Sequence, residues 1–122
     1  MSKKILLVDD SSTILMMEKL ILKKGPYELT MAGDGAEAVA AARAERPDLI
    51  LMDVVMPKVD GFEACRRLRA DPATRGIPVI MVTTRGEAEN MELGFGAGAN
   101  DYLTKPINGL ELLAKVKGLL GE

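Results

Sequence analysis

The sequence predicts an α/β fold in which five parallel strands form a doubly wound sheet with helices on both faces. Short apolar runs alternate along the chain with segments of helical period. The run Pro78 to Val82 lacks polar alternation, as a strand covered on both faces should. The length of 122 residues suits one domain with one core. We therefore expect a single α/β domain over residues 1–122.

Five runs have the length and composition of strands, and Gly, Pro or Asp residues bound several of them. The strands are expected near Lys4 to Val8, Tyr27 to Ala32, Asp48 to Met52, Pro78 to Val82, and Asp101 to Leu103. Right-handed connections between parallel strands give the doubly wound order 2-1-3-4-5.

Five helices are expected between and after these strands. Ser11 or Ser12 caps the first, which runs to about Lys24 and stops at Gly25-Pro26. Three further starts resemble a capping box, in which the first and fourth side chains satisfy each other's backbone N–H groups. These are Asp34-x-x-Glu37, Asp60-x-x-Glu63 and Asn108-x-x-Glu111.

The fourth helix, from about Gly86 to Ala97, contains Gly94 and Gly96. Each glycine costs about 0.8 to 1 kcal/mol relative to alanine, so we expect a loosely held last turn that moves. The other interpretation is that these glycines allow close packing around Phe95.

Composition and charge exclude several classes of function. The net charge of −2, without a dense Lys/Arg cluster, argues against nucleic-acid binding. Apolar runs are much shorter than the roughly 18 residues of a membrane span. Cys65 has no partner for an internal disulfide, and no apolar secretory segment precedes the first strand. A cytoplasmic location without membrane insertion is therefore expected.

Carboxylates follow two of the apolar runs. Asp53 follows the run 49–52, and Asp9 and Asp10 follow the run 5–8. In an open α/β sheet the carboxyl ends of the strands border the ligand crevice, here between the first and third strands. Any one of these acids alone would be interpreted as a solvated loop residue or a cap. Three acids together predict a site for a divalent cation.

Two other side chains come after neighbouring strands. Thr83 ends the fourth strand and Lys105 follows the fifth. A hydroxyl at a strand end often bonds its own backbone, and a lysine is usually a solvated surface cation. Their position at the same edge as the three acids favours a role in one site.

These residues resemble the response-regulator receiver domains of two-component signalling along nearly the whole chain. The matching segments are Ile5-Leu6-Leu7-Val8-Asp9-Asp10-Ser11, Asp48-Leu49-Ile50-Leu51-Met52-Asp53-Val54-Val55-Met56-Pro57, Asp60-Gly61, Pro78-Val79-Ile80-Met81-Val82-Thr83 and Gly98-Ala99-Asn100-Asp101-Tyr102-Leu103-Thr104-Lys105-Pro106. The resemblance implies a flavodoxin-like three-layer architecture. The order 2-1-3-4-5 is also that of the chemotaxis members of this family, so it is not an independent derivation.

The resemblance implies a role for each site residue. Asp53 would accept a phosphoryl group from a phosphohistidine on a sensor histidine kinase or phosphotransfer protein. Asp10, Asp53 and the Val55 carbonyl would hold Mg2+ directly, and Asp9 would hold it through water. Lys105 would place its charge on a phosphoryl oxygen.

The resemblance also implies a switch. The Thr83 hydroxyl would bind the phosphoryl group once it is attached, and Tyr102 would rotate inward. The alternative for Tyr102 is an ordinary tyrosine at a strand edge with its hydroxyl in water. Pro106 matches the family's cis peptide, which would aim Lys105 into the site. Val55 offers no side-chain hydrogen bond to an attacking water, which predicts a long-lived phosphorylated state.

The predicted function is a stand-alone phosphorylatable switch that signals through a downstream effector protein, as a monomer or weak dimer. Its chemistry would be self-catalysed phosphoryl transfer and slow autodephosphorylation. Motility, chemotaxis and a phosphorelay all remain open, as does a receiver cut from a longer regulator.

Three alternatives are disfavoured. A haloacid-dehalogenase-type phosphotransferase would carry a second aspartate two residues after the nucleophile, where this chain has Val55. A flavin carrier would need a phosphate-binding loop where Asp9 and Asp10 stand. A degenerate receiver would lack at least one required side chain, and none is missing.

Overall fold

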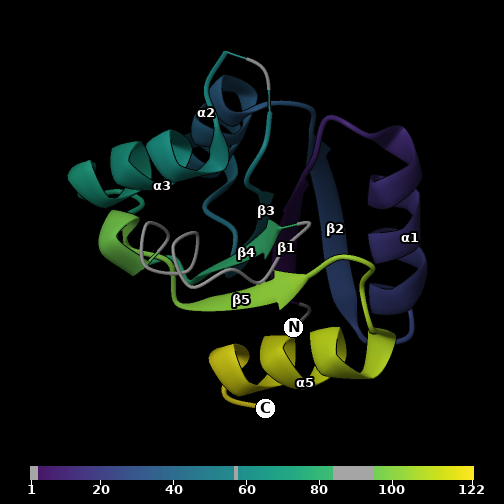
Figure 1. The fold of residues 1–122 in the computed structure, drawn as a ribbon. Helices are drawn as coiled ribbons and strands as arrows, with labels where there is room; N and C mark the ends of the chain where they lie inside the picture. The colour runs from purple at the N-terminus through teal and green to yellow at the C-terminus, as the bar shows by residue number, and fades with distance from the viewer. Residues whose placement is uncertain (1–2, 57, 84–94) are drawn as a thin grey trace.

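The computed structural model describes residues 3–56, 58–83 and 95–122 and confirms the predicted α/β fold (Figure 1). Five strands form one parallel sheet in the order β2-β1-β3-β4-β5, which is the predicted order. The strands are β1 (Lys3–Val8), β2 (Tyr27–Ala32), β3 (Leu49–Asp53), β4 (Val79–Thr83) and β5 (Asp101–Thr104).

The strand bounds differ from the predicted ones by one residue at most. Both β3 and β4 begin and end one residue later than expected, whereas β2 has its predicted bounds. Asp48 lies before β3 because its carboxylate accepts a hydrogen bond from the Lys4 backbone N–H at 2.8 Å. At the other end, Asp53 remains in the ladder because it pairs in register with Val82.

Four helices have full bounds in the described residues: α1 (Ser12–Leu22), α2 (Gly35–Glu45), α3 (Gly61–Ala70) and α5 (Gly109–Leu120). The predicted helix from Gly86 to Ala97 falls mostly outside the described residues, of which 95–97 are helical. Helix α1 ends two residues before the predicted Lys24, with Lys23 as its C-cap. None of the helices in the described ranges is long and apolar enough to cross a lipid bilayer.

Each predicted N-cap residue accepts a hydrogen bond from a backbone N–H of the first helical turn. Of the two candidates for α1, Ser11 is the cap, and its hydroxyl accepts from the Ile14 N–H at 3.3 Å. Asp34, Asp60 and Asn108 accept from the N–H groups of Glu37, Glu63 and Glu111 at 2.8, 2.8 and 3.1 Å.

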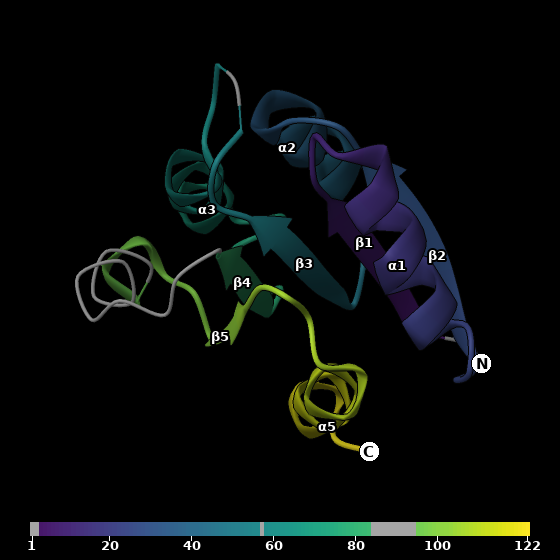
Figure 2. The same cartoon turned by 45° about the vertical axis from the view of Figure 1, so that its right-hand side comes forward.

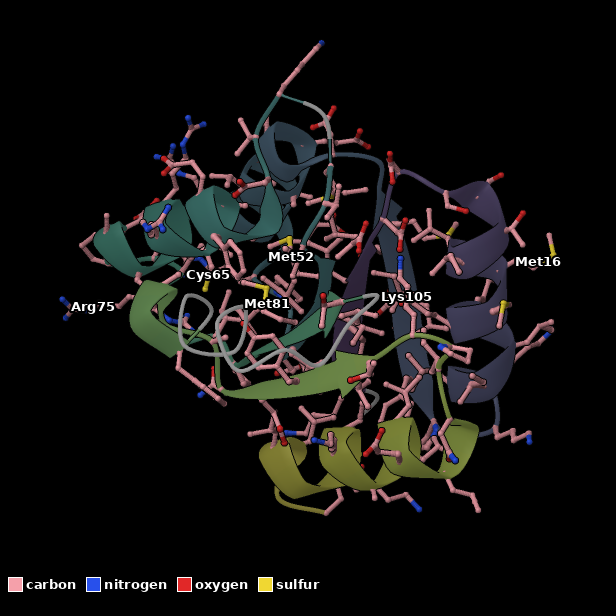
Figure 3. All side chains as sticks on the ribbon, viewed as in Figure 1. Met16, Met52, Cys65, Arg75, Met81 and Lys105 are labelled. Atoms are coloured by element: carbon pink, nitrogen blue, oxygen red, sulfur yellow. The ribbon has the colours of Figure 1, made fainter. Side chains whose placement is uncertain are left out.

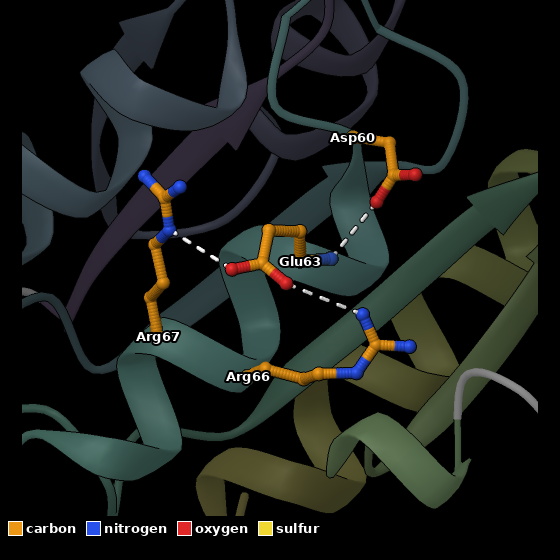
Figure 4. Close-up of polar contacts among 4 residues, drawn as sticks. All are labelled: Asp60, Glu63, Arg66 and Arg67. Atoms are coloured by element: carbon orange, nitrogen blue, oxygen red, sulfur yellow. Dashed lines mark hydrogen bonds and ion pairs between the residues drawn. The ribbon is translucent and has the colours of Figure 1, made fainter.

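At α3 the glutamate of the expected capping box has other partners. The Glu63 carboxylate pairs with Arg66 at 3.4 Å and Arg67 at 3.1 Å (Figure 4). These i,i+3 and i,i+4 pairs lie on the solvated face of the helix, where each contributes a few tenths of a kcal/mol.

The sheet is covered on both faces. Helices α2 and α3 lie on one face and α1 and α5 on the other (Figures 1 and 2). Because side chains alternate along a strand, Leu6 and Val8 join the core beneath α2 and α3, whereas Ile5 and Leu7 join the core beneath α1 and α5. The central strands therefore bury both faces, and polar side chains gather at their carboxyl ends.

Candidate functional site

The three predicted acids lie together at the carboxyl edge of the sheet. Asp53 is the last residue of β3, and Asp9 and Asp10 directly follow β1, the neighbouring strand. One carboxylate oxygen from each lies within 4.8 Å of the others. Asp9 and Asp53 are buried, and Asp10 is exposed. Parallel pairing of β1 with β3 thus converts two separate sequence segments into one acidic cluster.

Lys105, which directly follows β5, extends its side chain into this cluster. Its Nζ lies 3.2 Å from Asp9 Oδ2 and 3.2 Å from Asp53 Oδ1, and Figure 3 shows the side chain at the end of the sheet. The Lys105 backbone N–H donates to the Thr83 carbonyl at 2.6 Å. The peptide bond between Lys105 and Pro106 is cis, as predicted.

Burial and mutual repulsion set the charges of the site. Desolvation, followed by the nearby charge of Asp9, raises the pKa of Asp53 above its ordinary value, although Lys105 opposes the shift. Burial acts to lower the pKa of Lys105, but Asp53 and Asp9 outweigh it and the net pKa is raised. The ammonium group is therefore held in its charged form beside carboxylates that repel one another.

The donor set fits a hard divalent cation. Among the described residues, three carboxylates gather beside the Lys105 ammonium group, so this cluster has an excess of negative charge that a dication would neutralise. All the side-chain donors are oxygens, which Mg2+ and Ca2+ prefer. The exposure of Asp10 leaves one side open to water and to an incoming group.

The two predicted switch residues lie on β4 and β5. Thr83 is buried at the end of β4, where it pairs in register with Thr104. Tyr102 on β5 is also buried, and its ring packs edge-to-face on Phe95 with centroids 5.2 Å apart. This burial places Tyr102 in the core cluster beneath α2 and α3.

The segment after Asp53 is held close to the sheet by a glycine. The Gly61 N–H donates to the Val54 carbonyl at 2.9 Å. A Cβ at Gly61 would lie 2.3 Å from the Asp53 carbonyl oxygen, so any other residue would displace the start of α3. Val55, predicted to bind metal through its carbonyl, is 71% exposed as a residue.

Sequence reasoning missed one buried acid near the site. Glu18 on α1 is 1% exposed, and neither of its carboxylate oxygens has a hydrogen-bond partner. Burial, then repulsion from Asp9, raises its pKa from 4.5 to about 8, while Lys105 opposes the shift. The helical spacing to buried Leu22, four residues later, was the signal that Glu18 faces the core.

Residues 5–117 match the response regulator receiver domain family. The chain is 44% identical over 117 residues to the DNA-binding dual master transcriptional regulator RpaA of Synechocystis sp., covering 96% of this chain and 48% of that protein. It is 43% identical to Protein PilH of Pseudomonas aeruginosa, covering 96% of this chain and 97% of PilH.

Among solved structures, the receiver domain of sensor histidine kinase PA1611 from Pseudomonas aeruginosa superposes with a TM-score of 0.92 at 34% identity, covering all of both chains. That structure has a magnesium ion coordinated in its active-site cleft. The chain spans about half the length of RpaA and nearly all of PilH, so its relatives differ about twofold in length.

Proposed function

The chain belongs to the response regulator receiver domain family, and from this premise we propose that Asp53 accepts a phosphoryl group in a Mg2+-dependent reaction. The observation that carries the proposal is the position of Lys105, whose Nζ contacts both Asp53 and Asp9 inside a cluster of three acids. This arrangement combines a nucleophile, a set of metal donors and a cation in one partly open site.

Asp53 would act as the nucleophile. One of its carboxylate oxygens attacks the phosphorus of a phosphohistidine on a sensor kinase or phosphotransfer protein, and the phosphorus–nitrogen bond breaks. The imidazole leaves with the electron pair. Because phosphoryl transfer asks mainly for positioning and charge stabilisation, the fixed place of Asp53 at the end of a buried strand favours the reaction.

Bound Mg2+ would neutralise the anionic oxygens that meet during transfer. Asp10, Asp53 and the Val55 carbonyl would hold the ion directly, and Asp9 would hold it through water. Lys105 would then exchange its contacts with Asp9 and Asp53 for a phosphoryl oxygen. Burial, and then repulsion from Asp9, raises the pKa of Asp53, and a bound dication would favour the charged carboxylate against both effects.

Signalling would follow from Thr83 and Tyr102. The Thr83 hydroxyl donates to a phosphoryl oxygen and draws the end of β4 toward Asp53, and Tyr102 on the adjacent strand responds by repacking. This movement changes the affinity for a downstream effector protein. We propose a cytoplasmic monomer or weak dimer, either a stand-alone regulator of about the length of PilH or the receiver of a longer protein of about the length of RpaA.

The test uses intact-mass measurement after incubation with Mg2+ and acetyl phosphate. The wild-type protein gains the mass of one phosphoryl group, and a metal chelator prevents the gain. Asp53→Asn gains nothing, whereas Asp34→Asn, which changes a helix cap outside the site, behaves as wild type. An adduct on the Asp53→Asn variant, or labelling that ignores the chelator, would exclude the proposed function.

A further inference from the structure

Glu18 is a buried acid that the proposed mechanism does not use. It is 1% exposed, and neither of its carboxylate oxygens has a hydrogen-bond partner. A leucine or methionine would fill the same space without the cost of burying an unpaired polar group. The charged groups around Glu18 indicate what a carboxyl can do there that an apolar side chain cannot.

Three charged groups of the acidic site act on Glu18. They are Asp9, which follows β1, Asp53, which ends β3, and Lys105, which follows β5. Among the described residues, Glu18 is not one of the three acids that lie close enough together to share one ion. No hydrogen bond joins its carboxylate to the site, so these groups act on it through space.

The other charged residues of the elements that contact α1 are exposed or paired. Helix α1 packs against β1, β2 and α5. Lys115 of α5 pairs with Asp101 of β5 at 2.8 Å. The remaining charged residues of these elements and of α1 are exposed: Lys3, Lys4, Lys19, Glu28, Glu111 and Lys117. The charge state of the buried acid therefore depends mainly on burial and on the net charge of the acidic site.

A divalent cation would change that net charge. Three carboxylates beside one ammonium group carry a net charge of −2, which a dication cancels. Burial is the largest cause that raises the pKa of Glu18 to about 8, and repulsion from Asp9 is the next. A bound dication would relieve the repulsion and leave the burial, so the pKa would fall part of the way toward 4.5.

We propose that Glu18 couples the binding of Mg2+ to the release of a proton: its carboxyl is protonated before the ion enters the acidic site and gives the proton to water when the ion binds. The O–H bond breaks, and its electron pair stays on the carboxylate. This inference rests on the proposed function, because the ion that acts on Glu18 is the one that phosphoryl transfer requires. Loading of the site with metal then depends on pH near neutrality.

The first test follows the Glu18 carboxyl by carbon-13 NMR of protein labelled at its glutamate side-chain carboxyls. The signal that is missing from Glu18→Gln identifies it. We expect a titration midpoint of about 8 without divalent metal. With saturating Mg2+ we expect the midpoint to fall by about one pH unit, whereas NaCl at equal ionic strength leaves it nearly unchanged.

The amide signals of Asp9, Asp10 and Asp53 report in the same samples whether the ion binds. If the ion binds and the Glu18 midpoint does not move, this inference is overturned and the proposed function stands. If the protein binds no Mg2+ at any pH, both fail.

Reciprocity supplies a second test, because a proton released on metal binding makes the affinity for metal rise with pH. The affinity of wild type for Mg2+, divided by that of Glu18→Gln, should rise about tenfold between about pH 6 and about pH 9. Glu28→Gln, which changes an exposed glutamate on β2, should follow wild type. The same pH dependence in all three proteins would overturn the proposal.

A third test needs no variant, so it holds even if Glu18→Gln does not fold. Addition of MgCl2 to unbuffered wild-type protein held at about pH 7.5 should require base, up to one equivalent per ion bound. NaCl at the same ionic strength should require almost none. Binding of Mg2+ without any demand for base would overturn the proposal.

Discussion

At the scale of single residues, the buried acid Glu18 has the clearest consequence for stability. Both its carboxylate oxygens are buried without a hydrogen-bond partner. Burial is the main cause that raises its pKa from 4.5 to about 8. The folded protein therefore holds Glu18 in its neutral form over much of the pH range between 4.5 and about 8.

This shift predicts how stability depends on pH. The folded protein keeps a proton on Glu18 that the unfolded chain releases above pH 4.5, so the free energy of unfolding falls as pH rises from 4.5 to about 8. The slope is at most about 1.4 kcal/mol per pH unit. Glu18→Gln removes the contribution of Glu18 to this slope, so the stability of the variant relative to wild type rises progressively toward pH 8.

Urea unfolding in metal-free buffer across this pH range measures the effect. Glu28→Gln, which changes an exposed glutamate on β2, is the control and should follow the wild-type curve. A constant difference in unfolding free energy between Glu18→Gln and wild type at all pH values would contradict the prediction.

Val55 gives a second prediction at the residue scale, on the lifetime of the acyl phosphate. Its exposed side chain has no hydrogen-bonding group to orient an attacking water. Val55→Asn supplies one, so we expect dephosphorylation to accelerate several-fold, by an amount on the order of 1 kcal/mol in the barrier. Val55→Ile keeps the surface aliphatic and leaves the rate unchanged. Intact mass measured over time follows the loss of the phosphoryl group. An equal or slower rate of loss in Val55→Asn would show the idea to be wrong.

At the scale of elements, Arg69 connects α3 with the segments that lead into β4 and β5. Its guanidinium donates to the Gly98 carbonyl at 3.0 and 2.8 Å, to the Ile77 carbonyl at 2.7 Å and to Asn100 Oδ1 at 2.9 Å. Gly98 has a φ of +106°, and a Cβ there would lie 2.7 Å from Arg69 Cγ. One planar side chain thus fixes the approach to β5.

We expect Arg69→Lys to lower the free energy of unfolding by about 2 kcal/mol, because an ammonium group cannot reproduce the forked geometry. Arg66→Lys serves as the control, since Arg66 is exposed and forms a weak surface pair with Glu63, and its effect should stay within about 0.5 kcal/mol. Chemical denaturation measures both variants. Equal effects would mean that the contacts of Arg69 contribute little.

The elements that sequence predicted well are those with local signals. The strand runs, the caps at Asp34, Asp60 and Asn108, and the three acids at the strand ends all follow from neighbouring residues. The doubly wound topology then brings the acids and Lys105 together.

The features that sequence did not predict depend on partners far along the chain. Arg69 looks like any other surface arginine of α3 until Gly98, 29 residues later, is folded against it. On α1, Glu18 points inward and Leu20 outward, although a glutamate is usually exposed and a leucine is usually buried. Here packing of the whole helix on the sheet outweighs the preference of individual side chains.

At the scale of the whole molecule, the fold carries an acidic site that lowers its own stability. The charged form of Asp53 costs free energy on folding, because burial and then Asp9 raise its pKa against the opposing effect of Lys105. A carboxyl with a raised pKa reduces stability at every pH above its unfolded value. The cluster of acids therefore lowers the stability of the folded protein when no cation neutralises it.

Two opposite changes in stability should follow. Without divalent metal at neutral pH, Asp53→Asn should be more stable than wild type by on the order of 1 kcal/mol, since it removes one of the repelling charges. Added Mg2+ should stabilise wild type, by about 2.7 kcal/mol when its concentration is about 100 times the dissociation constant, because the ion binds only the folded form. Asp53→Asn lacks one metal donor and should be stabilised less by Mg2+, so its excess stability over wild type shrinks or reverses.

Thermal unfolding with Mg2+, compared with NaCl at equal ionic strength, separates metal binding from general screening. If the wild-type midpoint is the same in both salts, or if the variant is the less stable protein without metal, the acidic cluster is not the metal site that its geometry indicates.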